Sequence, residues 1–102
     1  MIRGEVWWAD VGGKRRPVLV LTRSEVIDVR ELVTVAEITA MIRGLAVEVP
    51  IDAIEAGLAE DSVVNCDGLH TVRRSSLTRR AGELQEPAMR HVCRAVIHAL
   101  GC

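Results

Sequence analysis

The feature that most constrains this sequence is one amphipathic helical pattern near its C-terminal end, preceded by a series of short β-rich runs. Pro87 suits the first turn of this helix, and Gly101 is suited to end it. The apolar residues between them recur at helical spacing on one face: Met89, Val92, Cys93, Val96, Ile97 and Leu100. A helix with one apolar face needs a partner surface, so we expect it to pack on a sheet formed by the preceding runs.

Short segments rich in β-branched residues predict the strands of this sheet. We expect strands at residues 4–11, 17–21, 32–39 and 46–49, and a β-hairpin of residues 62–66 and 69–72 that turns at Asp67-Gly68. Pro17 is placed at the first position of its strand, after a loop of residues 12–14. Single helical turns are predicted at 24–29, capped by Ser24, and at 51–56, stopped by Gly57. The fold class is therefore α+β, a mostly antiparallel sheet or small barrel with a C-terminal helix.

Length and composition together predict a dimer of single-domain subunits. A chain of 102 residues is expected to form one domain, residues 1–102, without length for a second core. Such a chain buries only about two-thirds of the surface of its unfolded state. Its hydrophobic fraction of 49% is nonetheless at the high end of ordinary usage. Some apolar surface is therefore expected to contact another subunit, which favours a homodimer.

The charge pattern excludes a globally basic nucleic-acid binder but not a local one. The formal net charge is −1, while the cations cluster in three short groups: Lys14-Arg15-Arg16, Arg73-Arg74 and Arg79-Arg80. Short basic groups are usually solvated surface, but two of them brought together by the fold would form a phosphate-attracting patch. Because the chain has no Tyr or Phe, base stacking would fall to Trp7, Trp8 or arginine planes.

The sequence shows no pattern typical of a metal site, a disulfide framework or a membrane segment. Its three cysteines form no CxxC pair, and no run of carboxylates indicates a two-metal nuclease. His91 and His98 are about 10 Å apart on the predicted helix, too far to ligate one metal ion. The polar start of the chain is unlike a signal peptide, and no apolar run approaches the roughly 18 residues of a membrane span. We therefore expect a cytoplasmic protein without a cofactor, a metal or membrane contact.

Arg16-Pro17, at the mouth of a buried strand, is the feature that points to chemistry. An arginine placed after a flexible glycine loop is fixed at its base while its guanidinium reaches a groove. The alternative is an ordinary strand-end arginine, which composition alone favours. His70, just past Asp67-Gly68, could also face a groove, although a structural or surface role is the commoner one for such a residue.

Motifs spread over nearly the whole chain resemble those of the MazF/PemK toxin family. In order, and spanning residues 3–101, they are Arg3-Gly4-Glu5-Val6-Trp7, Arg16-Pro17-Val18-Leu19-Val20, Ile38-Thr39-Ala40, Gly57-Leu58, Asp61-Ser62-Val63-Val64-Asn65-Cys66-Asp67, Thr71-Val72, Ser76-Leu77, Gly82-Glu83-Leu84 and the Pro87-initiated helix. Each motif is short, but their order and spacing together are specific. The resemblance implies a CcdB/PemK-like, SH3-like barrel with helices, a homodimer, and a toxin endoribonuclease neutralised by a cognate antitoxin.

The same resemblance implies the site residues and the reaction. The family's catalytic arginine falls on Arg16 and its catalytic threonine on Thr39; further RNA contacts are expected from Lys14, Arg15, Asp67 and His70. The implied reaction is metal-independent cleavage of single-stranded RNA, in which the 2′-OH attacks the adjacent phosphorus and leaves a 2′,3′-cyclic phosphate and a 5′-OH. Arg16 suits stabilisation of the phosphoryl charge, because a guanidinium can hold two phosphate oxygens and is a poor general base. Thr39 would hydrogen-bond the phosphate or the 2′-OH. His70 could supply a base near neutral pH, although nothing in the family pattern requires it.

Two departures from the family pattern limit what carries over. The loop before Arg16 is several residues shorter than in many members, and Gly68-Leu69-His70-Thr71 stands where many members carry Gln-Ile-Arg-Thr. The cleavage sequence and the class of RNA (mRNA, tRNA or rRNA) therefore do not carry over.

Two other functions stay open. One is a protein-binding gyrase poison resembling CcdB, although the Trp-Gly-Ile end of that protein's helix is replaced here by Ala99-Leu100-Gly101-Cys102. The other is a non-catalytic RNA-binding barrel, which would bind RNA without cutting it. If the chain is a toxin, its antitoxin is expected to be a disordered, acidic and hydrophobic segment that folds over the groove holding residues 14–16.

Overall fold

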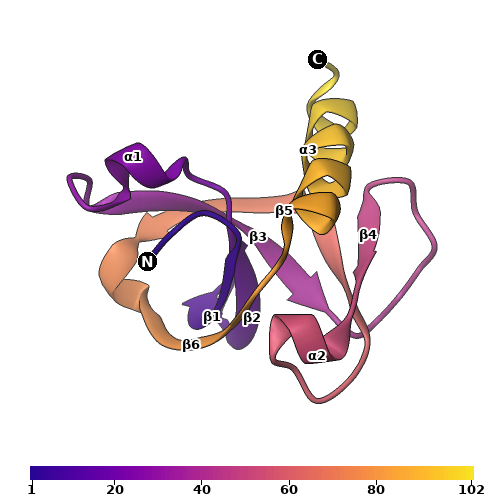
Figure 1. Ribbon diagram of the computed structural model, residues 1–102, viewed down its shortest axis with the longest axis horizontal. Helices are drawn as coiled ribbons and strands as arrows, with labels where there is room; N and C mark the ends of the chain where they lie inside the picture. Colours follow the sequence, from indigo (N-terminus) through magenta and orange to yellow (C-terminus); the bar gives the residue numbers. More distant parts are fainter.

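A curled six-stranded sheet carries the three α-helices of this protein, as a computed structural model of residues 1–102 shows (Figure 1). The strands are β1 (Glu5–Val11), β2 (Lys14–Val20), β3 (Leu32–Thr39), β4 (Glu48–Ile51), β5 (Ser62–Arg73) and β6 (Leu77–Glu83). The helices are α1 (Ser24–Ile27), α2 (Ala53–Ala56) and α3 (Glu86–Leu100), and a 3-10 turn, η1 (Arg74–Ser76), joins β5 to β6. Neighbouring strands are all antiparallel, in the order β4-β5-β3-β2-β1-β6. The predicted α+β class is confirmed.

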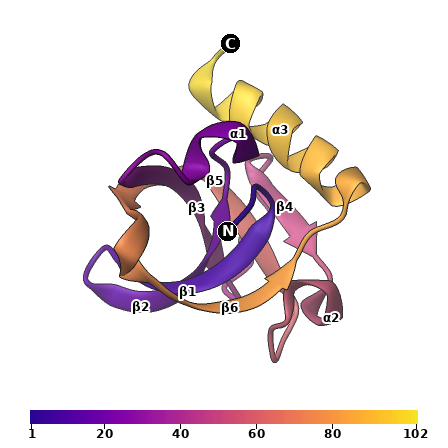
Figure 2. The ribbon, with the colours of Figure 1, turned by 60° about the vertical axis from the view of Figure 1, so that its left-hand side comes forward.

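The two faces of the sheet contribute to separate cores. Figure 2 shows the curl of this sheet, with α1 and α3 at the top of the view and α2 at the bottom. One core lies toward α3 and includes Val6, Leu19, Ile38, Val64 and Val92. The other lies toward α1 and includes Val18, Val20, Ile27, Val33 and Val35. Consecutive strand residues point to opposite faces, so β1, β2 and β3 each supply both cores. No helix in the fold is long and apolar enough to cross a membrane.

The C-terminal helix α3 forms where the sequence predicts it. Pro87 lies in its first turn, and Gly101 ends it with a left-handed φ of 74°. Met89, Val92 and Ala95 are buried against the sheet, beside β4 and β5. Ile97 and Leu100, however, are 52% and 62% exposed. The predicted apolar face is therefore covered by this chain only toward the N-terminal end of the helix.

β5 is one continuous strand, although the sequence predicts a hairpin at Asp67-Gly68. Both halves of β5 pair with β3, with Ala36 opposite Leu69 and Glu37 opposite Asn65. Residues 66–68, which lie between these two pairs, form a bulge in the register. The hairpin prediction is wrong because an Asp-Gly pair between apolar runs is compatible with either a turn or a bulge, and the partner strand decides between them.

The course of β2 also differs from the prediction. Lys14 is the first residue of β2, so the loop contains only Gly12 and Gly13. Pro17 lies inside the strand, opposite Trp8, and not at its start. It is tolerated there because β3 pairs with β2 only from Val18 onward. Pro17 therefore needs no N–H to donate toward β3.

Smaller differences occur at α1, β4 and β6. Ser24 is not an N-cap; its hydroxyl accepts the N–H of Arg3 at 3.0 Å, and Arg23 precedes the helix without a side-chain cap. β4 begins two residues later than expected and includes Pro50, which is tolerated because β4 is an edge strand. β6 has no counterpart among the predicted strands, since its central residues are polar and exposed and give no apolar alternation.

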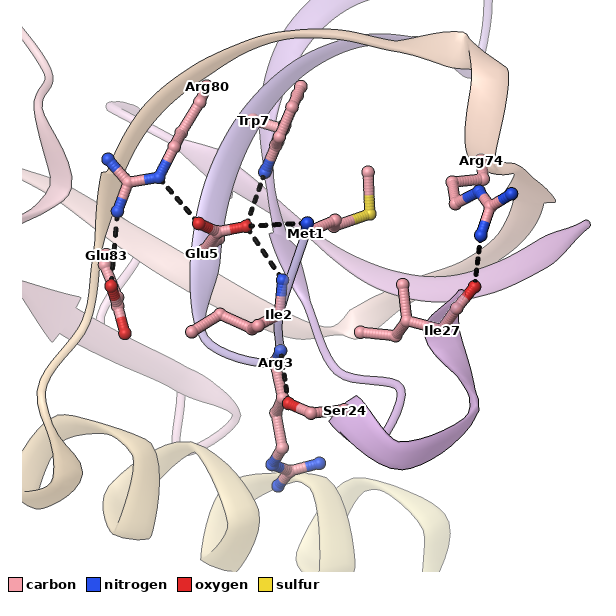
Figure 3. A network of polar contacts seen from close by, with 10 residues as sticks. All are labelled: Met1, Ile2, Arg3, Glu5, Trp7, Ser24, Ile27, Arg74, Arg80 and Glu83. Atoms are coloured by element: carbon pink, nitrogen blue, oxygen red, sulfur yellow. Dashed lines mark hydrogen bonds and ion pairs between the residues drawn. The ribbon is translucent and has the colours of Figure 1, made fainter. Parts of the chain in front are cut away.

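A buried carboxylate ties the start of the chain to β6 (Figure 3). Glu5 is 8% exposed; its Oε2 accepts from Nε of Arg80 at 2.7 Å, and its Oε1 accepts from the Ile2 N–H at 2.8 Å and from Nε1 of Trp7 at 3.2 Å. Burial raises the pKa of the Glu5 carboxyl, but the hydrogen bonds from Arg80, Ile2 and Trp7 outweigh it, and the pKa is lowered. The folded protein therefore favours the ionised carboxylate.

Glu5→Gln should lower the free energy of unfolding by about 2 kcal/mol at neutral pH, because a charged acceptor of several hydrogen bonds is lost. The folded-state pKa of Glu5 is lowered, so its contribution is present above the ordinary glutamate range and is lost as the pH falls through the folded-state value. Urea denaturation of both proteins across this range should show their difference shrinking on acidification. A difference that grows as the pH falls would contradict this account.

Candidate functional site

A groove of about 340 Å³ lies where β2 begins and β3 ends. Its walls come from Trp8 on β1, Lys14, Arg15, Arg16 and Pro17 on β2, Ile38, Thr39 and Ala40 at the end of β3, and Leu58, Ala59, Glu60 and Ser62 after α2. The groove thus combines three cations, two hydroxyl groups and an indole ring. This composition suits a phosphodiester with a base stacked beside it.

The tight turn between β1 and β2 places the cations at the rim of the groove. Gly12 and Gly13 both have a left-handed φ, of 63° and 78°, which two-residue hairpin turns of this type require. β2 consequently starts at Lys14, directly opposite Val11. Lys14 and Arg15 are exposed, and Arg16, the next residue inward, is half-buried.

A second basic group reaches the same region through Trp8. In the register of the sheet, Trp8 has Pro17 on one side and Arg79 on the other. The Arg79 guanidinium lies over the indole ring, 5.7 Å from its centroid, in a cation–π contact. Arg73, by contrast, pairs with Leu32 at the other end of β3. Arg79 therefore lies beside Trp8, at the border of the groove that residues 14–16 line.

Arg16 is held by a carboxylate that the sequence analysis does not single out. Nη1 of Arg16 donates a charge-assisted hydrogen bond to Oε1 of Glu37, and Oε2 of Glu37 lies 3.5 Å from Nε2 of His70. All three side chains point to one face of the sheet, because Val18 lies opposite Glu37 and Val35 lies opposite His70. Their side chains are 25%, 17% and 32% exposed, so water screens this cluster only partly.

The Thr39 hydroxyl is oriented by the backbone that follows β3. Its Oγ1 accepts the N–H of Met41 at 3.0 Å. A hydroxyl that accepts one hydrogen bond keeps its own proton for a second partner. Thr39 can therefore donate into the groove.

The structure brings some of the predicted site residues together and separates others. Lys14, Arg15, Arg16 and Thr39 line one groove. His70 does not line it and is linked to it through Glu37. Asp67 is exposed on the β5 bulge, outside the groove, and its N–H donates to Oδ1 of Asn65 at 3.1 Å.

Sequence reasoning missed Glu37, although one signal was available. Glu37 is the only charged residue in the predicted strand 32–39. A charge within an otherwise apolar strand needs a partner, because leaving it unpaired in a partly buried position is costly. The sequence does not reveal that the partners are Arg16 and His70, which lie 21 and 33 positions away along the chain.

Metal-ligating and nucleophilic side chains are dispersed in this fold. No three His, Cys, Asp or Glu side chains lie close enough to hold a metal ion. His91 and His98 lie along a different groove, beside Glu48 and Arg94. All three cysteines are free thiols, and burial, with smaller effects of Asp67 and Cys93, raises the pKa of Cys66 to about 11. Cys66 is therefore a protonated core residue.

Comparison with known proteins identifies relatives along the whole chain. Residues 2–100 match the family described as PemK-like, MazF-like toxin of type II toxin-antitoxin system. Two relatives are from Mycobacterium tuberculosis. Probable endoribonuclease MazF2 is 39% identical over 102 residues, all of both chains, and Endoribonuclease MazF3 is 51% identical over 79 residues, covering 74% of this chain and 76% of the relative.

Solved structures agree with these sequence matches. The Mycobacterium tuberculosis toxin MazF-mt6 is similar with a TM-score of 0.89 and 40% identity, over 95% of this chain and 96% of that one. An endoribonuclease in complex with its cognate antitoxin, from a Mycobacterial species, has a TM-score of 0.88 over 99% of this chain and 95% of that one. At 23% identity, the second structure shows a shared fold alone. The matches confirm the resemblance that the sequence motifs carry.

Proposed function

This chain belongs to the PemK-like, MazF-like toxin family of type II toxin–antitoxin systems, and from that premise we propose that its groove cleaves single-stranded RNA. The protein is an endoribonuclease, as its curated relatives are. The observation that supports this groove as the site is the convergence of Lys14, Arg15, Arg16 and Thr39 beside Trp8. None of the relatives described above is a gyrase poison, so the endoribonuclease is favoured over that alternative.

In the proposed reaction, the 2′-OH of the substrate attacks the adjacent phosphorus and the 5′-oxygen leaves. Arg16 stabilises the charge on the phosphoryl oxygens, since its guanidinium keeps free N–H donors beyond the one that Glu37 occupies. Thr39 donates a hydrogen bond to the phosphate, because its oxygen already accepts from Met41. Lys14 and Arg15 neutralise flanking phosphates, and Trp8 offers a face for a base.

Asp67 and His70 are proposed to contact RNA away from the cleaved bond. Both lie on β5, outside the groove. They would meet nucleotides flanking the cleaved bond if the RNA continues from the groove across β3 and β5. A protection experiment with a non-cleavable RNA, comparing wild type with His70→Ala, would measure whether these nucleotides are bound.

The direct test is to incubate the purified protein with RNA and sequence the new 5′-OH ends. We expect a discrete set of cut sites that all share a short sequence, and equal cleavage in EDTA, because no residues here are grouped as metal ligands. RNA binding without cleavage would select the non-catalytic barrel. Cleavage that requires added Mg²⁺ would identify a different class of nuclease.

A cognate antitoxin is the proposed protein partner. We expect a disordered, acidic and hydrophobic segment that folds over residues 14–16 and competes with RNA for the same cations. Displacement of labelled RNA by that segment would measure the competition. Simultaneous binding of both would contradict a shared groove.

Residues 1–102 are proposed to form one toxin domain that acts as a homodimer in the cytoplasm, where its RNA substrate is. An apolar groove of about 520 Å³ supports the dimer; it lies beside Leu21, Leu69, Val96, Ile97 and Leu100. Light scattering during gel filtration would measure the mass of the particle. A monomer at micromolar concentration would contradict this part of the proposal.

A further inference from the structure

Glu37 differs from a solvated surface carboxylate because its side chain is mostly buried and contacts two other side chains. Its two oxygens are divided between two partners, with Oε1 accepting from Nη1 of Arg16 and Oε2 lying 3.5 Å from Nε2 of His70. The three residues come from three adjacent strands, β2, β3 and β5. Only 17% of the Glu37 side chain is exposed. Arg16 therefore holds one oxygen by a hydrogen bond, while His70 lies against the other without a hydrogen bond.

The β5 bulge provides the space for this carboxylate. A Cβ atom at Gly68 would lie 2.3 Å from Oε2 of Glu37 and 3.1 Å from Nδ2 of Asn65. Gly68 does not have a positive φ, so its backbone conformation does not require glycine. The steric requirement at residue 68 is thus space for Glu37, whose carboxylate packs directly over the bulge.

The Arg16 guanidinium depends on Glu37 for its orientation. Nε of Arg16 is enclosed and makes no hydrogen bond within the protein, so the contact from Nη1 to Glu37 is the polar contact that orients the group. An arginine side chain has several rotatable bonds, and an unanchored one would sample many positions. Stabilisation of a transition state requires its donors to be in place beforehand.

We propose that Glu37 is a positioning residue for cleavage: it fixes Arg16 through one oxygen, while the Gly68 bulge and the neighbouring His70 ring enclose the carboxylate itself. The inference rests on the proposed function, in which Arg16 contacts the scissile phosphate. A charged positioning residue also affects RNA binding, which a purely structural residue would not do. The negative charge of Glu37 lies beside the phosphate-binding guanidinium and opposes the binding of RNA, so Glu37 weakens binding while it promotes the chemical step.

The test uses the full-length protein and an oligoribonucleotide with one mapped cleavage site. Glu37→Ala should lower kcat about 100-fold, because Arg16 is no longer oriented. The same variant should lower KM about threefold, since one opposing charge is removed. Glu37→Gln should give the same decrease in KM with a smaller loss in kcat, because an amide oxygen still accepts from Arg16. Binding to the oligonucleotide with a 2′-deoxy nucleotide at the cleaved position should tighten in both variants.

Gly68→Ala provides an independent variant that changes no charge. The added methyl group should displace the flexible Glu37 carboxylate and leave the backbone in place. We expect kcat to fall as in Glu37→Ala, without the decrease in KM, because the negative charge remains near the site.

Glu86→Gln is the matched control, since Glu86 forms an exposed ion pair with Arg90 on α3, outside the groove. The kcat and KM of Glu86→Gln should both stay within about twofold of the wild-type values. If Arg16→Ala still cleaves RNA, the proposed site fails whatever Glu37 does. If Arg16→Ala is inactive but Glu37→Ala and Gly68→Ala keep wild-type kcat, Glu37 has no positioning role. A kcat loss in Glu37→Ala with unchanged KM and a matching fall in folded fraction would also overturn the proposal.

Discussion

Arg16→Ala should reduce RNA cleavage by about 1,000-fold or more while leaving the protein folded. The side chain lines the groove and is 25% exposed, so its removal leaves little cavity in either core. What is lost is the donor that offsets charge on the phosphoryl oxygens as the 2′-OH attacks. Arg16→Lys should recover little activity, because an ammonium keeps the charge but not the planar pair of donors.

Cleavage of a mapped oligonucleotide and thermal unfolding should be measured on the same preparations. Arg90→Ala is a suitable control, since it removes one exposed arginine from α3 and should keep full activity. RNA affinity should fall modestly in Arg16→Ala, with a shallower salt dependence, because one phosphate contact is lost. Undiminished cleavage by folded Arg16→Ala would remove Arg16 from the mechanism.

Gly57→Ala should destabilise the fold by about 4 kcal/mol or more, a large part of the stability of a domain of this size. Gly57 ends α2 with a left-handed φ of 72°. A Cβ atom there would lie 1.9 Å from the Ala81 carbonyl oxygen and 2.5 Å from its carbon, both in the backbone of β6. In the same way, a Cβ atom added to Gly82 on β6 would lie 2.5 Å from the carbonyl carbon of Ala56 on α2. The two glycines let α2 and β6 approach backbone to backbone, and no side-chain rotation can relieve the overlap.

Gly101→Ala separates steric overlap from backbone strain. Gly101 ends α3 with nearly the same φ, 74°, but nothing lies within 4 Å of its Cβ position. This variant should therefore lose only about 1 kcal/mol, the cost of the left-handed conformation. Urea denaturation of both variants would measure the difference. Equal losses in the two variants would show that the contact between α2 and β6 can adjust.

Several elements could be predicted from sequence because the signals that specify them are local. The period of the apolar residues defines α3, the alternation of residues between two faces defines β1, and β-branched runs define β3 and most of β2. The antiparallel α+β class follows from these elements. Arg16 and Thr39 could be named as site candidates because short motifs around them resemble a family, and the structure places both in one groove.

Tertiary structure decided the features that depend on the pairing of distant segments, namely the β5 bulge and the contacts of Glu37. Asp67-Gly68 is a bulge and not a hairpin turn because both halves of β5 find β3 as their partner. Glu37 meets Arg16 and His70 only in that register. A shift of one residue would turn each side chain to the other face of the sheet. The sequence by itself therefore determined the C-terminal helix, most of the strand segments other than β6, and the short motifs that mark Arg16 and Thr39. The contacts that orient Arg16 arise from strand register, which no local pattern encodes.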